Sequence, residues 1–124
     1  MKLLLDTHVL LVLLSCDYPL SPTARAAIEQ PGANLICSTV NVWEIAIKRS
    51  IGKLEAPENV IERIDEAGAR ILTITPQHAH ATGELPLHHR DPFDRLLIAQ
   101  AQLEGFTIIT GDSAFCAYDV PVVW

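Results

Sequence analysis

The stretch Lys2-Leu3-Leu4-Leu5-Asp6 decides the fold, because a short apolar run here ends directly on a carboxylate. Residues 2–5 predict a buried strand, and residues 7–14 after them predict a helix. The same alternation continues along the chain. We expect further strands at 34–37, 70–74, 106–110 and 120–123, and helices at 23–30, 39–50, 57–67, 76–82 and 92–103. Strands separated by helices predict an α/β fold with a parallel sheet covered on both faces.

Length and composition narrow the possibilities further. The chain has 124 residues, which suits one domain, and its 49% hydrophobic and 19% charged residues exclude a disordered chain. The longest apolar run, Val9–Leu14, is far shorter than the roughly 20 residues that span a membrane. Asp6 and His8 interrupt the apolar start, which argues against a secretion signal. We expect a single domain over residues 1–124 with no membrane segment.

Cysteine and charge content bear on the compartment and the partners. Cys16, Cys37 and Cys116 are far apart and form no CxxC pair, which favours reduced thiols in the cytoplasm over a zinc knuckle. Nine basic and 15 acidic residues give a net charge of −6. This balance argues against a basic protein that coats nucleic acid. It permits an enzyme that approaches a phosphate backbone through bound cations.

Two carboxylates directly follow predicted strands. Asp6 ends the first strand, and Asp112 follows the strand at 106–110 through Gly111. Each side chain can cap a helix or bind a ligand, and one carboxylate can do both. Ligands of parallel sheets bind beyond the carboxyl ends of the strands, so neighbouring strands would bring both acids to one cleft. Asp119 is a weaker candidate because it precedes the last predicted strand.

A third carboxylate lies within the helix at 39–50. The residues around Glu44 are apolar on nearly every side, which predicts that this helix is largely buried. A buried carboxylate is costly unless it is paired or binds a metal ion. The alternative is an ordinary ion pair with Lys48, one turn further along. The apolar surplus of this helix also fits a dimer face.

The fourth carboxylate lies in the run Asp91-Pro92-Phe93-Asp94-Arg95, which begins the last predicted helix. Asp91 suits the N-cap and Pro92 the first helical position, so Asp94 falls one turn into the helix. Both acids are favourable near the positive end of the helix dipole. We expect Asp91 to be the cap and Asp94 to be a ligand.

These four carboxylates together suggest a metal site. Without cations they would repel one another and raise one another's pKa values. Their hard oxygen atoms suit Mg²⁺ or Mn²⁺, and two such ions can support phosphodiester cleavage. Basic residues near these positions would form a rim for a phosphate backbone, or would be ordinary solvated charges. They are Lys48, Arg49, Lys53, Arg90 and Arg95.

The sequence resembles the PIN domain, and within it the VapC-like toxin ribonucleases of bacterial toxin–antitoxin pairs. Four motifs in order carry the resemblance. They are Leu-Leu-Leu-Asp-Thr-His at 3–8, Val-Trp-Glu-Ile at 42–45, Asp-Pro-Phe-Asp-Arg-Leu-Leu-Ile-Ala-Gln-Ala at 91–101 and Ile-Ile-Thr-Gly-Asp at 108–112. Each motif is weak alone, but their order and spacing over almost the whole chain are specific.

The resemblance implies a three-layer α/β/α sandwich and hydrolysis of RNA phosphodiester bonds, which would arrest growth of the host cell. It implies a Mg²⁺ or Mn²⁺ site, with Thr110 as a small hydroxyl residue near the last acid. Similar toxins form homodimers, and an antitoxin holds them inactive by placing its tail in the acidic groove. The implied ligands are Asp6, Glu44, Asp94 and Asp112.

Other functions remain open from the residues alone. A non-catalytic module could use the same acidic groove to bind a basic partner peptide. A phosphotransfer domain is disfavoured because His8 stands where such an enzyme needs a second aspartate. His78 and His80 do not share a helix face, which argues against a zinc site. His88, His89 or Arg90 could line the cleft and contact RNA, but an ordinary solvated surface loop is favoured for them.

Overall fold

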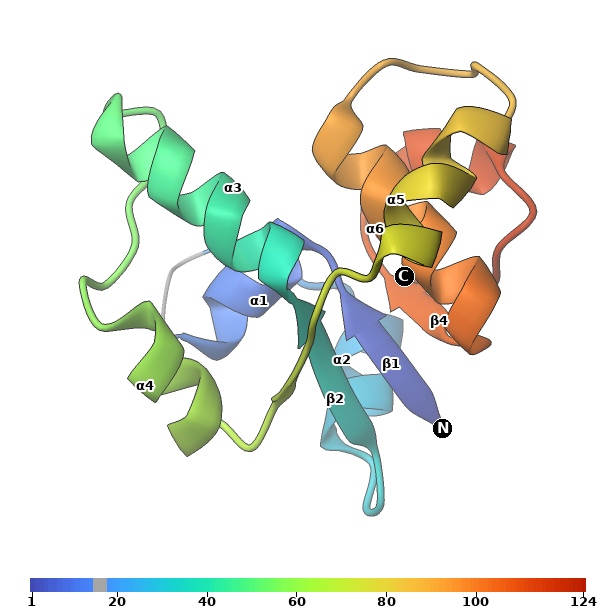
Figure 1. The fold of residues 1–124 in the computed structure, drawn as a ribbon. Coiled ribbons are helices and arrows are strands. Elements are labelled where there is room, and N and C mark those ends of the chain that lie inside the picture. Colours follow the sequence, from blue (N-terminus) through green and yellow to red (C-terminus); the bar gives the residue numbers. More distant parts are fainter. Residues whose placement is uncertain (15–17) are drawn as a thin grey trace.

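The computed structural model describes residues 1–14 and 18–124, and Cys16 therefore lies outside the described residues. Within these residues, five parallel strands form one sheet in the order β3-β2-β1-β4-β5. Figure 1 shows β2, β1 and β4 side by side. The strands are β1 (Lys2–Leu5), β2 (Asn34–Ser38), β3 (Arg70–Leu72), β4 (Thr107–Ile109) and β5 (Val122–Val123). The predicted α/β fold with a parallel sheet is confirmed.

Among the described residues, six α-helices and two short 3-10 helices connect and cover the strands. The α-helices are α1 (Thr7–Leu13), α2 (Pro22–Glu29), α3 (Thr39–Ser50), α4 (Val60–Glu66), α5 (Pro76–Ala81) and α6 (Pro92–Glu104). The 3-10 helices are η1 (Thr82–Glu84) and η2 (Ser113–Ala117). Within residues 1–14 and 18–124, no helix is long and apolar enough to cross a membrane.

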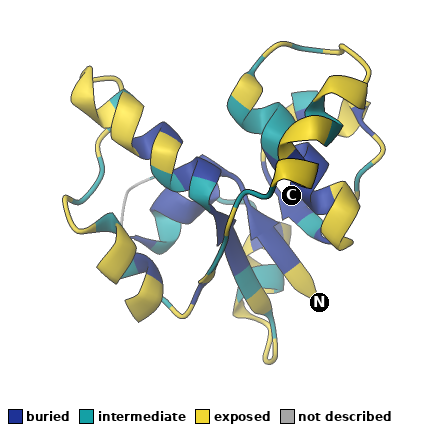
Figure 2. Cartoon of the chain, viewed as in Figure 1, coloured by how far each residue is buried: buried dark blue, intermediate teal, exposed yellow. Residues whose placement is uncertain are grey.

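The central strand β1 separates two apolar cores. Leu3 and Leu5 point to one face of the sheet, where they join a cluster that includes residues of α1, α2 and α4. Leu4 points to the other face and packs in a second cluster with residues of α6. All three leucines are fully buried, and Figure 2 shows the buried strands beneath helices whose outer surfaces are exposed. This alternation makes the sheet the middle layer of three.

Several predicted boundaries shift, and the pairing partners explain two of the shifts. The strand expected at 70–74 ends at Leu72, which pairs with Ser38, the last residue of β2. The strand expected at 120–123 is limited to Val122–Val123, because only these residues pair with β4. The helix expected at 57–67 begins at Val60, since residues 58–59 form a turn.

The prediction that helix α3 is largely buried is wrong. The side of α3 that carries Glu44 and Ile45 is buried, whereas Trp43 is 54% exposed and Ile47 is 37% exposed. The helix packs through one face only, so its apolar surplus faces outward.

The carboxyl ends of β1, β2 and β4 meet at one edge of the sheet. Asp6 follows β1, Ser38 ends β2 and caps α3, and Thr110 follows β4. The backbone N–H of Asp6 donates to the carbonyl of Ile109 at 3.1 Å, which holds the first and last of these segments together. This edge is where the predicted site residues lie.

Candidate functional site

Asp6 is held at the start of α1 by two hydrogen bonds. Its Oδ1 accepts from the backbone N–H of Val9 at 2.8 Å, so the expected helix cap is present. The hydroxyl of Thr110 donates to its Oδ2. The same hydroxyl accepts from the backbone N–H of Asp112 at 3.1 Å. Thr110 therefore fixes Asp6 and the segment that carries Asp112 relative to one another.

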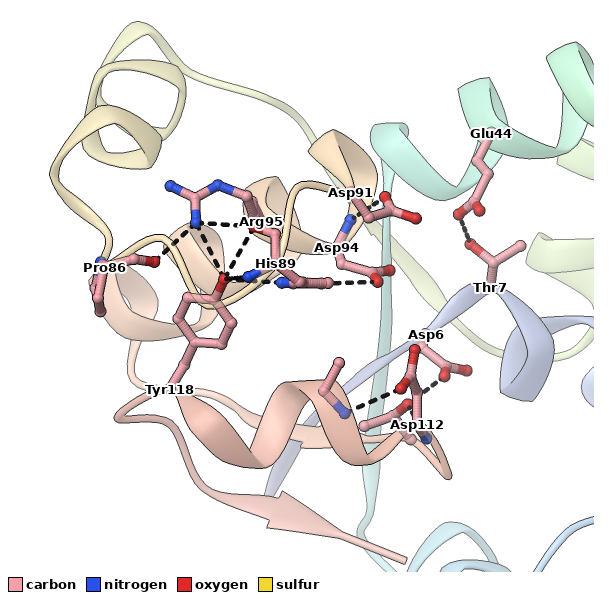
Figure 3. Close-up of polar contacts among 12 residues, drawn as sticks. Asp6, Thr7, Glu44, Pro86, His89, Asp91, Asp94, Arg95, Asp112 and Tyr118 are labelled. Carbon is pink, nitrogen blue, oxygen red and sulfur yellow. Dashed lines mark hydrogen bonds and ion pairs between the residues drawn. The ribbon is translucent and has the colours of Figure 1, made fainter.

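Asp112 is the most exposed of the four carboxylates. It caps the 3-10 helix η2 by accepting from the backbone N–H of Ala114 at 3.0 Å through Oδ1. Figure 3 shows the side chains of Asp6 and Asp112 next to each other at the sheet edge. The expectation that both acids face one cleft agrees with this placement.

Glu44 is buried and has partners for both oxygen atoms. The hydroxyl of Thr7 donates to Oε1 at 2.5 Å, and the ammonium of Lys48 donates to Oε2 at 2.5 Å. The Asn41 side-chain amide supports this arrangement by donating to the Thr7 hydroxyl at 3.1 Å. The ion pair considered as an alternative is therefore present, and hydrogen bonding to Glu44 raises the pKa of Lys48.

Asp94 lies in the first turn of α6, as predicted. The carboxylate of Asp91 caps the helix by accepting from the Asp94 backbone N–H at 3.0 Å, which confirms its expected cap role. Burial raises the pKa of Asp94 to about 7, and the negative charge of Asp91 adds to this effect. A hydrogen bond from His89 opposes the rise.

The segment before α6 supplies a contact that the sequence did not predict. A solvated loop was favoured for His89 over a position at the cleft, but its side chain is only 21% exposed and its Nε2 lies 3.2 Å from Oδ2 of Asp94. Its Nδ1 lies 2.8 Å from the hydroxyl of Tyr118. A histidine two residues before a helix cap does not by itself predict such a contact, because the contact depends on where the fold places Tyr118.

Arg95 has a different role from the one expected for a basic rim. Its guanidinium donates to the carbonyls of Pro86 at 2.8 Å and Thr82 at 2.9 Å, and to the Tyr118 hydroxyl at 3.0 Å. Figure 3 shows the guanidinium on the side of the 82–89 segment, away from the carboxylates. Arg95 therefore holds the loop that carries His89.

The other basic candidates divide by position. Lys48 lies near the acids, and the negative charges of Asp91 and Asp94 contribute to raising its pKa. Arg49 instead pairs with Glu58 at 3.3 Å on the surface. Lys48 is thus a basic side chain placed against the acidic group.

The four carboxylates influence one another electrostatically. The charges of Glu44 and Asp112 both raise the pKa of Asp94. Burial raises the pKa of Asp6, and Glu44 adds a smaller contribution in the same direction. Figure 3 shows Asp94 and Glu44 facing the space above Asp6 and Asp112. The parallel sheet therefore gathers acids that are up to 106 positions apart in the chain (112 − 6 = 106).

The chemistry of this donor set fits a hard divalent cation, because it offers carboxylate oxygens whose mutual repulsion a cation relieves. The side chains as they lie are looser than a preformed chelate. Among the residues that the structure describes, no three His, Cys, Asp or Glu side chains stand close enough together to hold a metal ion. Binding would therefore require side-chain adjustment.

Comparisons with known proteins agree with the fold. A family model described as PIN domain matches residues 3–121. Among solved structures, VapBC2 from Rickettsia felis bound to a promoter DNA fragment has a TM-score of 0.70 and 17% identity, over 98% of this chain and 97% of that chain. VapBC-1 from nontypeable Haemophilus influenzae has a TM-score of 0.68 and 19% identity, over 98% and 96%.

A third structure, DNA-bound VapBC from Salmonella typhimurium, has a TM-score of 0.65 and 16% identity, over 98% of this chain and 96% of that chain. No curated protein matches the sequence. At these identities the solved structures establish the architecture, and they confirm the predicted α/β/α sandwich.

Proposed function

Because this chain belongs to the PIN domain family, we propose that it is a metal-dependent endoribonuclease and the VapC-like toxin of a toxin–antitoxin pair. Its substrate would be RNA, and the reaction would be hydrolysis of phosphodiester bonds. The resemblance of its motifs to VapC-like toxins and its likeness in fold to VapBC proteins support this proposal.

The observation that carries the proposal is the group of acids at the carboxyl edge of the sheet. Asp6 and Asp94 have raised pKa values, chiefly because burial disfavours their charged forms. Holding several desolvated carboxylates together destabilises a protein, so their presence is better explained by function than by folding. A divalent cation is the chemical partner that would make such a group favourable.

The cation would be Mg²⁺ or Mn²⁺, held by Asp6, Glu44, Asp94 and Asp112 directly or through water. When bound, such a cation activates water and stabilises the leaving oxygen of a phosphodiester. The chain's own residues position these ligands. Thr110 orients Asp6 through its hydroxyl, and the 3.2 Å contact with His89 orients Asp94.

Lys48 would assist in binding the substrate. Its ammonium forms an ion pair with Glu44 and lies near the charges of Asp91 and Asp94. When a cation neutralises part of the acidic group, this ammonium becomes available to a phosphate oxygen of RNA. A basic side chain at the acidic centre would thus help an acidic protein of net charge −6 to bind a polyanion.

The proposed partners follow from the exposed face of α3. Trp43 and Ile47 of α3 and its C-cap residue Ile51 are exposed, and they are spaced four residues apart along the helix that carries Glu44. Such an apolar stripe suits a protein partner. We assign it to a cognate antitoxin whose tail would reach the acidic group. The proposal also includes a homodimer that acts in the cytoplasm.

A second function is favoured by a specific observation. The described residues hold no preformed chelating group, and the ammonium of Lys48 already lies 2.5 Å from Glu44. These features suit a non-catalytic module that binds the lysine and arginine side chains of a basic peptide. Metal-dependent cleavage of RNA would distinguish the nuclease from the peptide-binding module.

The test is cleavage of total cellular RNA by purified protein with Mn²⁺ or Mg²⁺, in parallel with excess chelator. We expect discrete fragments from the wild type that disappear in chelator and in Asp6→Asn. Asp119→Asn is the matched control because Asp119 is exposed and lies outside the acidic group. Undiminished cleavage in chelator would reject the metal mechanism. Absence of any cleavage under these conditions would favour the binding module.

A further inference from the structure

A cavity beside the acidic group has no role in the proposed reaction so far. It has a volume of about 340 Å³ and lies between the start of α1 and the segment that follows β4. Asp6 and Asp112 form part of its wall. The rings of His8, Tyr18 and Trp124 also line it. The cavity is therefore continuous with the proposed catalytic carboxylates and is rich in aromatic side chains.

The indole of Trp124 packs against Gly111 at the wall of this cavity. A Cβ atom placed on Gly111 would come within 2.7 Å of two indole carbons. The glycine is thus explained by the space that the indole occupies, and its backbone needs no left-handed conformation. Trp124 remains 41% exposed. Part of the ring packs against Gly111 while the rest stays accessible, and Asp112 lines the same cavity.

Two further aromatic rings line the same cavity. The rings of His8 and Tyr18 meet edge to face, with centroids 5.2 Å apart and an interplanar angle of 73°. The side chain of His8 is exposed and follows Asp6 by two residues. His8 also acts on the acidic group, because its charge lowers the pKa of Asp6. The gathering of all three rings at the border of this group needs a separate explanation.

We propose that this cavity is a nucleobase subsite, in which the base of a single-stranded RNA nucleotide stacks on Trp124. The inference rests on the proposed function, because the phosphate to be cleaved would lie at Asp6 and Asp112. A base is joined to its phosphate through a single sugar, so the neighbouring base reaches a cavity that shares these two carboxylates.

Stacking suits the features of the cavity. Every base has an aromatic face, so an aromatic platform binds unpaired nucleotides with little dependence on sequence. The face of a base is hidden in a duplex, and recognition here would therefore favour single-stranded loops and ends. Carboxylate oxygens at the border can also accept hydrogen bonds from the amino groups of bases.

The experiment compares two oligomers of equal length and charge in the presence of Mg²⁺. One is a short 2′-O-methyl uridine oligomer, whose integrity is checked by gel electrophoresis after each measurement, and the other has the same backbone without bases. Binding of each labelled oligomer is followed by fluorescence anisotropy. The proteins are the wild type, Trp124→Ala, Trp124→Phe and Leu103→Ala. Leu103 is an exposed apolar residue of α6 that does not line the cavity, and serves as the matched control.

We expect the wild type and Leu103→Ala to prefer the base-containing oligomer by about 10- to 100-fold, the range for stacking of one base on an aromatic ring. Trp124→Ala should lose this preference, and Trp124→Phe should retain part of it. Equal affinity for the two oligomers, or a preference unchanged in Trp124→Ala, would overturn the subsite. So would the absence of detectable binding of the base-containing oligomer to the wild type.

Failure of the subsite and failure of the nuclease are distinguishable. Cleavage of cellular RNA together with equal affinity for the two oligomers would keep the nuclease and reject the subsite. A base preference that depends on Trp124, without cleavage of any RNA, would keep the subsite and reject the nuclease.

Discussion

The carboxylate of Asp94 shows the conflict between folding and function at the scale of one residue. Burial and the charge of Asp91 raise its pKa to about 7, whereas the same group in an unfolded chain titrates near 3.8. Between these values the folded protein binds more protons than the unfolded chain does. The contribution of Asp94 to stability therefore falls as the pH rises through this window. It is least favourable above pH 7, when no cation is bound.

This sign leads to a test of the metal-free protein. Asp94→Asn should raise the free energy of unfolding at pH 8 by about 1 kcal/mol, because it removes a desolvated charge. At pH 4 the two proteins should differ little in this respect, since the wild-type carboxyl is then protonated in the fold. Urea unfolding in chelator at both pH values measures the difference. A variant that is less stable at pH 8 than the wild type would contradict the proposed electrostatic cost.

The hydroxyl of Tyr118 provides a second test at this scale. It lies 2.8 Å from Nδ1 of His89, whose other nitrogen contacts Asp94. Tyr118→Phe should lower kcat for RNA cleavage by about tenfold while leaving KM nearly unchanged, because it loosens a ligand without touching the substrate. Single-substrate kinetics with Mn²⁺ separate the two parameters. An unchanged kcat would show that His89 does not depend on Tyr118 for its position.

The positions of the acids along their helices and strands could be predicted from the sequence more fully than their side-chain contacts could. Asp6, Asp91 and Asp112 were recognisable because each follows a strand or begins a helix. The contact between His89 and Asp94 was not, because its geometry depends on Tyr118, which lies 29 residues away. Local patterns carry the position of a residue along an element and say little about contacts between loops.

At the scale of elements, the start of α3 links helix formation to the acidic group. Ser38 caps the helix, and its backbone N–H donates to Oδ1 of Asn41 at 2.7 Å. The amide of Asn41 also donates to the hydroxyl of Thr7, which in turn donates to Glu44. The residue that completes the helix cap thus also orients a proposed ligand.

Asn41→Ala should therefore cost more than an ordinary helix substitution. Asn41 is fully buried, and its removal leaves the Ser38 N–H without its partner. We expect a loss of about 2 kcal/mol in the free energy of unfolding, measured by urea denaturation. Ser50→Ala, near the exposed end of the same helix, should cost less than half as much because its hydroxyl only bonds the carbonyl of Ile47. Equal losses would contradict the special role of this cap.

The boundaries of elements were less predictable than their existence. The helix that begins at Val60 was expected three residues earlier, and its N-cap Asn59 makes no capping hydrogen bond through its side chain. The length of β5 depends on the partner residues Ile108 and Ile109. Hydrophobic periodicity specifies the type of an element, whereas its ends depend on pairing and capping that only the assembled fold provides.

For the whole molecule, the parallel sheet explains how distant acids meet. β1 and β4 are neighbours, so Asp6 and Thr110 lie in hydrogen-bonding contact although they are 104 positions apart. The alternation of strands and helices predicted a parallel sheet with ligands at its carboxyl edge, but it left open whether β1 and β4 are neighbours. It could not predict that the described side chains stop short of a chelating group, because rotamers without a bound cation follow local hydrogen bonds.

Binding of Mn²⁺ to the metal-free protein tests the central claim most directly, because the acidic group is proposed to hold a divalent cation. Isothermal titration calorimetry on the wild type should detect binding that is lost in Asp94→Asn and kept in Asp119→Asn. Mn²⁺ should also stabilise the wild type against thermal unfolding, by about 2.7 kcal/mol at a Mn²⁺ concentration of 100 times the Kd. A wild type without detectable binding, or with the same binding in Asp94→Asn, would contradict the account.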